Sequence, residues 1–276
     1  MAKRSIPHPS SVQRIGCYNL GNCATDLMNP IEASPPNASP CHPSQWGTDE
    51  LTRFMKTAEE NGFATFEHLR PEFDSLIRIN RLFHLANDCM TNVEHWFPCL
   101  FVLKSHAAYQ GACRLIISGQ IPEGFQVLRG ALEASLYGFH IAQHPDEAKV
   151  WLRRDEGEEQ KQKVREAFKP KVIIRALKVV NEEAGKAADR MYEELIDYGA
   201  HPNEKGLSLR LETLSDEEKR EFRINMLNPK TEYLQFGIKT SGRVGLVCVR
   251  IFGVIEPERY QLSGLDLEWQ KLAKGY

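Results

Sequence analysis

The sequence predicts an all-α protein, an antiparallel helical bundle that follows a flexible N-terminal arm. Apolar residues recur with a helical period from Thr48 to the end of the chain. The breaks in this period coincide with prolines and glycines, which end helices. With 276 residues, of which 42% are hydrophobic, the chain is long enough to bury one large core.

Residues 1–47 form the predicted arm, because they are rich in Pro, Ser, Asn and Gly and lack a sustained apolar period. Residues 48–276 form the predicted bundle domain. The arm holds residues of metal-binding type at Cys17, Cys23, Cys41 and His42. Cys17 and Cys23 lie six positions apart, whereas zinc ligands usually pair across a gap of about two residues. We therefore expect free thiols and no metal site in the arm.

The first predicted helix starts in "TDELTRFMKTAEENG", which offers a threonine cap, acids in the first turn and a closing glycine. Further helices are predicted at about 64–90, 91–119, 122–143, 145–167, 169–200, 215–226 and 231–255, with a polar crossing loop at about 202–230. They are separated by Gly119 to Pro122, His144-Pro145, Lys169-Pro170 and His201-Pro202. Two segments, "KVIIRALKVV" and "VGLVCVRIFGVI", are rich in β-branched residues and are also compatible with strands. Length favours helices, because each belongs to a pattern of about 25 residues or more.

Composition and charge exclude several classes of protein. Lysine and arginine number 35 against 37 acids, so no surplus of positive charge attracts nucleic acid and any such contact must be local. The seven scattered cysteines favour a reducing cytoplasm. The longest apolar stretch, 244–255, is too short to cross a bilayer and contains Arg250, so we do not expect a membrane protein. Glycine-rich phosphate loops and the motifs of zinc proteases and esterases are absent from the sequence, and no cofactor is expected.

The predicted helix "PEGFQVLRGALEASLYGFHIAQH" has two broad faces that both suit packing. Phe125, Leu128, Leu132, Leu136 and Phe139 form one apolar stripe, and small residues at 130, 134 and 138 allow a second helix to approach closely. A narrow polar stripe remains, made of Gln126, Arg129, Glu133, Tyr137 and His140. This stripe is either a solvent-exposed face with one Arg129–Glu133 pair or an interior site in which the two charges are hydrogen-bonded to each other.

The preceding helix carries a second polar stripe, in which His106, Gln110 and Arg114 follow one another at four-residue steps. The short turn "SGQIP" joins the two helices, so they should be adjacent and antiparallel. If the two stripes face each other, they form a polar seam. The alternative is two independent solvent-exposed faces.

His201 ends the segment "AADRMYEELIDYGAHP", directly before Pro202. Gly199 is available for a left-handed turn there, and the helix C-terminus favours an imidazolium, so His201 has a sufficient role as a helix cap. In the functional alternative His201, with Tyr198 and Asp197 nearby, is a general acid or base delivered to the polar seam. Arg129 and Glu133 would then be its charged partners.

Three segments, "LRGALEASLYGFHI", "YEELIDYGAHP" and "KTSGRVGLVCVRIFGVI", resemble a family of uncharacterised bacterial helical proteins, a domain of unknown function related to the HEPN superfamily. The resemblance covers about residues 90 to 260 and implies an α-helical bundle that self-associates. It also implies a metal-independent ribonuclease of a defence system. The superfamily's catalytic motif, an arginine followed after four to six residues by a histidine, does not include His201, because the nearest upstream arginine is Arg190. The one matching spacing, Arg78 to His84, lies outside the resembling stretch.

Two functions follow. In the first, a cytoplasmic, homo-oligomeric protein of bacterial stress or phage defence cleaves or binds RNA. His201 is then the acid or base, Arg129 stabilises phosphate charge and Glu133 orients the arginine. The binding residues are expected to be Tyr198, Tyr137, His106, Gln110 and Arg114. In the second, the bundle is not an enzyme, the same residues form a structural network, and function lies in binding a protein partner or a small ligand.

Overall fold

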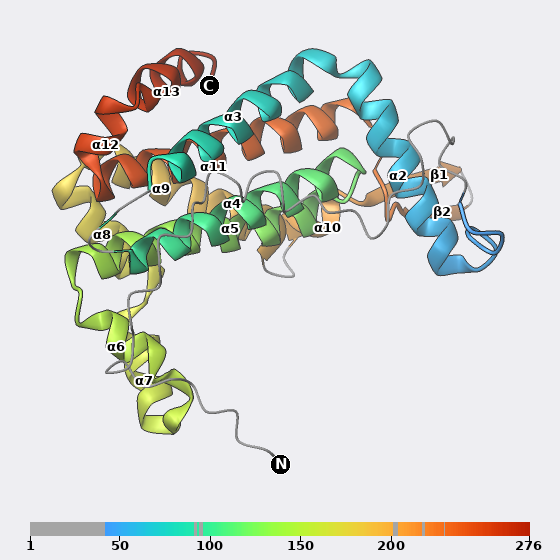
Figure 1. The fold of residues 1–276 in the computed structure, drawn as a ribbon. Helices are drawn as coiled ribbons and strands as arrows, with labels where there is room; N and C mark the ends of the chain where they lie inside the picture. Colours follow the sequence, from blue (N-terminus) through green and yellow to red (C-terminus); the bar gives the residue numbers. More distant parts are fainter. Residues whose placement is uncertain (1–41, 91–92, 94–95, 201–203, 217–218, 229) are drawn as a thin grey trace.

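The computed structural model describes residues 42–90, 93, 96–200, 204–216, 219–228 and 230–276. Helices dominate it, as predicted, and the described residues form one additional antiparallel hairpin (Figure 1). The helices are α2 (Glu50–His68), α3 (Arg70–Asp88), α4 (Phe97–Ile117), α5 (Ile121–Gln143), α6 (Glu147–Leu152), α7 (Glu158–Ala167), α8 (Pro170–Val180), α9 (Glu182–Leu195), α10 (Glu204–Ser208), α11 (Thr231–Ile255), α12 (Pro257–Leu262) and α13 (Leu265–Ala273). A 3₁₀ turn (Arg154–Glu156) precedes α7, a π-helical turn (Ile196–Ala200) follows α9, and the strands are β1 (Leu211–Asp216) and β2 (Lys219–Ile224).

Helix α5 is the centre of the bundle and is buried on both of its broad faces, as its sequence predicts. Phe125, Leu128, Leu132 and Leu136 are completely buried among α4, α9 and α11. The two segments rich in β-branched residues are helical, in α8 and α11. Helices α6 and α7 project away from the rest of the bundle, whereas α2 and the hairpin lie at the end opposite α8 and α12 (Figure 1).

Helices α4 and α5 are adjacent and antiparallel, as the short connecting turn predicts, and they approach closely through small residues. A Cβ atom added to Gly124 would lie 2.3 Å from Cγ1 of Ile116, and Gly138 fits against α4 in a similar way. Between these points the hydroxyls of Ser105 and Ser135 form a hydrogen bond of 2.9 Å in the core. The sides of α4 and α5 that point toward each other are fully occupied by this contact.

Several predicted helix boundaries were wrong, because side-chain caps and one glycine begin or divide the helices at other residues. Asp49, and not Thr48, caps α2 by accepting a hydrogen bond of 2.9 Å from the backbone N–H of Thr52, and the helix continues past Gly62. The single helix predicted over 169–200 is divided at Asn181, whose side chain caps α9. The segment 145–167 is likewise divided, because Gly157 adopts a positive φ of 156° between the 3₁₀ turn and α7.

The helix predicted at 215–226 was also wrong, since this segment belongs to the antiparallel hairpin that pairs Leu211 with Ile224 and Asp216 with Lys219. The chain after the hairpin is held by Asn228, whose backbone N–H donates to the Gly119 carbonyl at 3.0 Å. Its side-chain amide donates to the Leu209 carbonyl at 2.7 Å. Strand pairing across a short turn therefore overrides the helical preference of this charged segment.

Residues 1–41, which make up most of the predicted arm and include its three cysteines, lie outside the described residues, as does His201. Among the described helices, none is both long enough and apolar enough to cross a membrane. Self-association through the small-residue row of α5 is restricted, because Ala134 and Gly138 are buried within the chain. Only Gly130 of that row has open space at its Cα.

Candidate functional site on helix α5

The polar stripe of α5 lies along its contact with α9, and its centre is an Arg129–Glu133 ion pair. Arg129 Nε donates to Glu133 Oε1 at 2.8 Å. The two side chains are 25% and 26% exposed, so the pair is neither a free surface pair nor fully enclosed. At this depth each charge needs its partner to offset the hydration that it has lost, and solvent still reaches both side chains.

Tyr192 of α9 completes the network from the other side of the contact. Its hydroxyl accepts a hydrogen bond of 3.1 Å from Arg129 Nη2 and donates one of 3.3 Å to Glu133 Oε1. Burial alone would lower the pKa of Arg129, but Glu133 and Tyr192 outweigh it and the pKa is raised above its ordinary value. Burial, followed by the charge of Glu133, raises the pKa of Tyr192. The network therefore keeps a charged guanidinium and a neutral phenol at physiological pH.

Lys171 of α8 approaches the same tyrosine ring and ties α8 to α9. Its Nζ atom lies 5.4 Å from the ring centroid of Tyr192, a cation–π distance. Lys171 also forms ion pairs with Asp189, at 2.8 Å, and with Glu193. Arg129 and Lys171 thus both lie against the Tyr192 ring, each paired with an acid, and we use the name α5–α9 groove for the contact region made by Arg129, Glu133, Tyr192 and Lys171.

The π-helical turn Ile196–Ala200 carries the chain from α9 along the first turn of α5. A Cβ atom on Gly199 would lie 2.6 Å from the Pro122 carbonyl oxygen and 2.6 Å from the Phe125 Cβ atom. The predicted left-handed role of Gly199 was wrong, because its φ is not positive and it instead permits this close approach. π-helical turns occur frequently at functional sites. The next residue, His201, lies outside the described residues, so its catalytic role stays a prediction.

Tyr198 and Asp197 face away from the Arg129 network. The Tyr198 ring packs on Phe236 with centroids 5.2 Å apart, and Lys205 lies 5.5 Å from the same ring. Asp197 accepts a 2.5 Å ion-pair contact from Lys205. Tyr198, predicted as a binding residue, therefore lines the α10–α11 side of the turn.

His106 is a buried, neutral histidine that faces α3. Its ring stacks on Phe83 with centroids 5.0 Å apart. The donor assignments that satisfy both ring nitrogens are Nε2–H to Asn80 Oδ1 at 2.7 Å and Asn87 Nδ2 to Nδ1 at 3.0 Å. Burial, with the neighbouring His84, lowers the pKa of His106 to about 4. Both nitrogens are engaged, so His106 holds α4 against α3.

Of the two alternatives for the polar stripes of α4 and α5, the seam between these helices is not formed, and the stripes lie on independent faces. Gln110 donates to Asn80 of α3 at 3.1 Å, as His106 does, and Arg114 is exposed. The Arg129–Glu133 pair instead contacts α9. The two stripes therefore line different grooves, because the small residues and serines of α4 and α5 occupy the face between these helices.

Tyr137, one turn beyond Glu133, opens onto a cleft that we call the α5–α8 cleft. Burial, followed by the charge of Glu133, raises the pKa of Tyr137 to about 12. The cleft is lined by aromatic and basic residues with two smaller apolar ones: Tyr137, Trp151, Phe168, Arg154, Arg165, Lys169, Val164 and Pro170. Of these residues, the sequence prediction included Tyr137 alone. The available signal was the short spacing of Trp151 to Arg154 and of Arg165 to Lys169.

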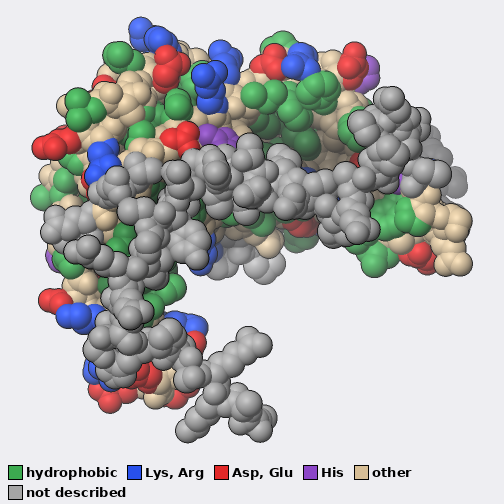
Figure 2. Space-filling view, viewed as in Figure 1, with side chains coloured by type: hydrophobic (Ala, Val, Ile, Leu, Met, Phe, Trp, Pro, Cys, Tyr) green, Lys and Arg blue, Asp and Glu red, His purple; other side chains and the backbone are tan. Residues whose placement is uncertain are grey.

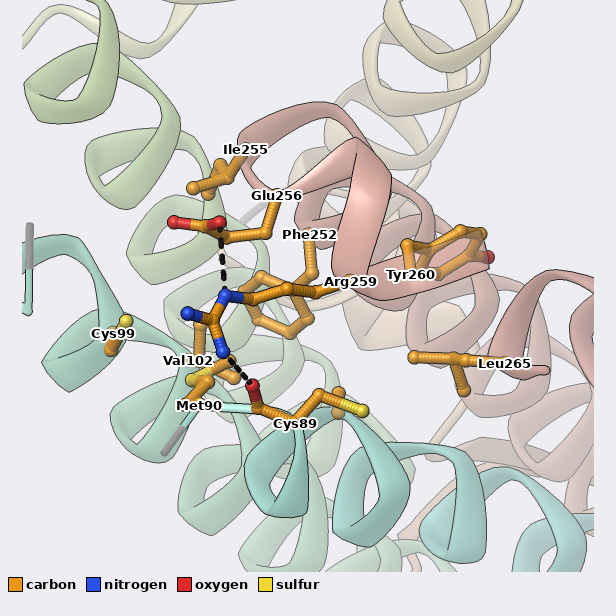
Figure 3. A pocket seen from close by; sticks show the side chains of 11 residues that line it. Cys89, Met90, Cys99, Val102, Phe252, Ile255, Glu256, Arg259, Tyr260 and Leu265 are labelled. Atoms are coloured by element: carbon orange, nitrogen blue, oxygen red, sulfur yellow. Dashed lines mark hydrogen bonds and ion pairs between the residues drawn. The ribbon is translucent and has the colours of Figure 1, made fainter. Parts of the chain in front are cut away.

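A separate apolar pocket lies where α12 meets α3, α4 and α11 (Figure 3). The Arg259 guanidinium crosses it, donating from Nη1 to the Cys89 carbonyl at 3.1 Å and lying 3.6 Å from Glu256. Burial raises the pKa of the Cys99 thiol to about 11, so this thiol is protonated and a weak nucleophile at neutral pH. The pocket offers apolar contact and little reactive chemistry.

Acidic and basic side chains are mixed over the face in Figure 2, without a broad patch of one sign. Any nucleic-acid contact on that face must therefore be local, in line with the net charge of −2. Comparisons of the chain with protein-family models, with curated proteins and with solved structures find no match.

Proposed function

We propose that the chain is a HEPN-like helical bundle that binds RNA at the α5–α9 groove and cleaves it there, as a part of bacterial stress or phage defence. The proposal rests on the hydrogen bonds and the exposure of the Arg129 side chain. Glu133 and Tyr192 engage two of its N–H groups and fix its plane, while a quarter of the side chain stays exposed. A guanidinium has about five N–H donors, so donors remain for a phosphate oxygen.

The proposed roles follow from this arrangement. Arg129 stabilises negative charge on the phosphate, and Glu133 and Tyr192 orient it. His201 supplies the acid or base that takes a proton from the attacking ribose hydroxyl or gives one to the leaving oxygen. Homo-oligomer formation belongs to the same proposal, as an expectation from the family resemblance.

A second function is favoured by a different feature of the same network. Arg129, Glu133 and Tyr192 satisfy one another, and His106 is satisfied at both nitrogens. Polar groups that are hydrogen-bonded to one another also suit a non-enzymatic bundle, in which they hold the helices together. Such a bundle would bind a protein partner or a small ligand.

The test expresses wild type, His201→Ala and Arg129→Ala in a bacterial host and scores growth and RNA integrity. Arg53→Ala is the matched control, because Arg53 is an exposed arginine of α2, at the end of the bundle opposite α8 (Figure 1). We expect wild type and the control to slow growth and degrade RNA, and the other two variants to do neither.

Purified proteins then separate cleavage from binding. If wild type leaves RNA intact but binds a labelled single-stranded RNA, and Arg129→Ala weakens this binding about tenfold more than Arg53→Ala does, the groove binds RNA without cleaving it. If wild type neither cleaves nor binds RNA, the non-enzymatic function replaces the proposal.

A further inference from the structure

We propose that the α5–α8 cleft binds a nucleoside phosphate, with the base on its aromatic residues and the phosphates on its basic ones. This inference concerns a small-molecule site and does not rest on the proposed action on RNA. It comes from the composition of the cleft, which combines aromatic rings and uncompensated positive charge.

The aromatic side consists of rings that buried phenylalanines hold in place. Trp151 meets Phe101 edge-on with centroids 5.4 Å apart, and Tyr137 meets Phe168 at 5.0 Å. Phe101 and Phe168 are buried, whereas Trp151 and Tyr137 are half-buried and line the cleft. A fixed, partly exposed aromatic surface suits stacking of a planar base, because little side-chain freedom is lost on binding.

The basic side consists of Arg154, Arg165 and Lys169, and none of the described residues that line the cleft is acidic. Arg165 and Lys169 form no ion pair with any residue that the structure describes, although Arg165 lies within electrostatic range of Glu158, and the Arg154–Asp155 contact of 3.0 Å is between exposed side chains. Positive charge in a concave surface without a counter-charge attracts an anion.

The other basic residues of α6 and α7 show that this lack of partners is local. Each has an acid within ion-pair distance: Lys149 with Asp146, Arg153 with Glu156, Lys161 with Glu158, and Lys163 with Glu159. Of the cations that border the cleft, Arg165 and Lys169 therefore differ from their neighbours in forming no such pair with a described residue, whereas Arg154 contacts Asp155. Uncompensated cations beside aromatic rings favour a ligand with a planar base and phosphates over either an apolar ligand or inorganic phosphate.

The experiment titrates the full chain with ATP, GTP and UTP while recording tryptophan fluorescence and heat of binding. Adenosine and tripolyphosphate test each half of the ligand alone. We expect nucleotides to quench fluorescence, and the quench to be lost in Trp151→Phe, which keeps an aromatic ring and leaves the other three tryptophans in place. Each half alone should bind about tenfold more weakly or worse.

Charge variants test the basic side. The double variant Arg165→Gln/Lys169→Gln should lose at least about tenfold in nucleotide affinity. The matched control is Lys104→Gln/Arg175→Gln, which removes the same charge from exposed positions outside the cleft and should bind as wild type does. Arg129→Ala should also bind nucleotide as wild type does, which separates this site from the α5–α9 groove.

Four results of these titrations, and one result with RNA, would overturn the proposal. These are no binding of any of the three nucleotides up to about 5 mM, equal losses in the two charge variants, tripolyphosphate binding as tightly as ATP, or a fluorescence quench that persists in Trp151→Phe. Binding of a single-stranded RNA oligomer without binding of any mononucleotide would also overturn it and would assign the cleft to RNA.

Discussion

Replacing Tyr192 with phenylalanine removes one oxygen atom from the α5–α9 groove and leaves the ring in place. The hydroxyl accepts from Arg129 at 3.1 Å and donates to Glu133 at 3.3 Å, and Tyr192 is only 5% exposed. A hydrogen bond to a charged group typically contributes about 1.5–3 kcal/mol. Both bonds are long, and Arg129 and Glu133 remain bonded to each other, so we expect a loss of about 1–2 kcal/mol in the free energy of unfolding.

Urea unfolding followed by circular dichroism measures this loss. The matched control is Tyr198→Phe, because the Tyr198 hydroxyl has no hydrogen bond to a described residue while its ring is packed on Phe236. We expect this control to change the free energy of unfolding by less than about 0.5 kcal/mol. A double-mutant cycle with Glu133→Gln should give a coupling of about 1 kcal/mol. A Tyr192→Phe protein as stable as its control would refute the idea that the network ties α5 to α9.

Three further predictions concern stability. The pKa of His106 is lowered to about 4 from its ordinary 6.5, so the unfolded chain takes up this proton first as the pH falls. The free energy of unfolding should therefore fall between pH 6.5 and 4 by up to about 1.4 kcal/mol per pH unit, and urea unfolding of His106→Gln over this range should lack that contribution. Gly199→Ala places a methyl group 2.6 Å from α5 and should lower the melting temperature, whereas Gly130→Ala enters open space and should add about 0.5–1 kcal/mol. Thr65→Val removes the 2.7 Å hydrogen bond from a buried hydroxyl to the Ile117 carbonyl and should cost about 1–2 kcal/mol in urea unfolding.

The helical class and the burial of α5 could be predicted because both depend on a local period. The hairpin could not be predicted in the same way, because its strands are charged and are defined by their pairing with each other. One signal was present in the alternation of Phe222 and Ile224, but both side chains are largely exposed, so the pattern does not mark a core strand. The prolines and glycines located most ends of helices, while side-chain caps such as Asn181 fixed the internal breaks.

For the candidate site, sequence periodicity predicts which residues share a helix face but does not predict which residues of other helices they contact. The spacing placed Arg129 and Glu133 on one stripe, but Tyr192 was not predicted as their partner. Its signal was a tyrosine between Ala188 and Leu195 on the buried face of α9, where a hydroxyl requires a hydrogen-bond partner.

Sequence periodicity defines the direction in which each stripe points from its own helix axis. How two packed helices are rotated relative to each other is set by the residues at their contact. For α4 and α5 these are Gly124, Gly138, Ser105 and Ser135, which bring the two backbones together and turn both polar stripes outward, toward α3 and α9. Small residues at 124, 131, 135 and 138 share a face of α5 that lies beside the apolar stripe and includes only position 138 of the predicted small-residue row. In a bundle whose helices pack through glycine and serine, this small-residue face predicts which two helices are in close contact, and each polar stripe then faces a different helix, α3 for α4 and α9 for α5.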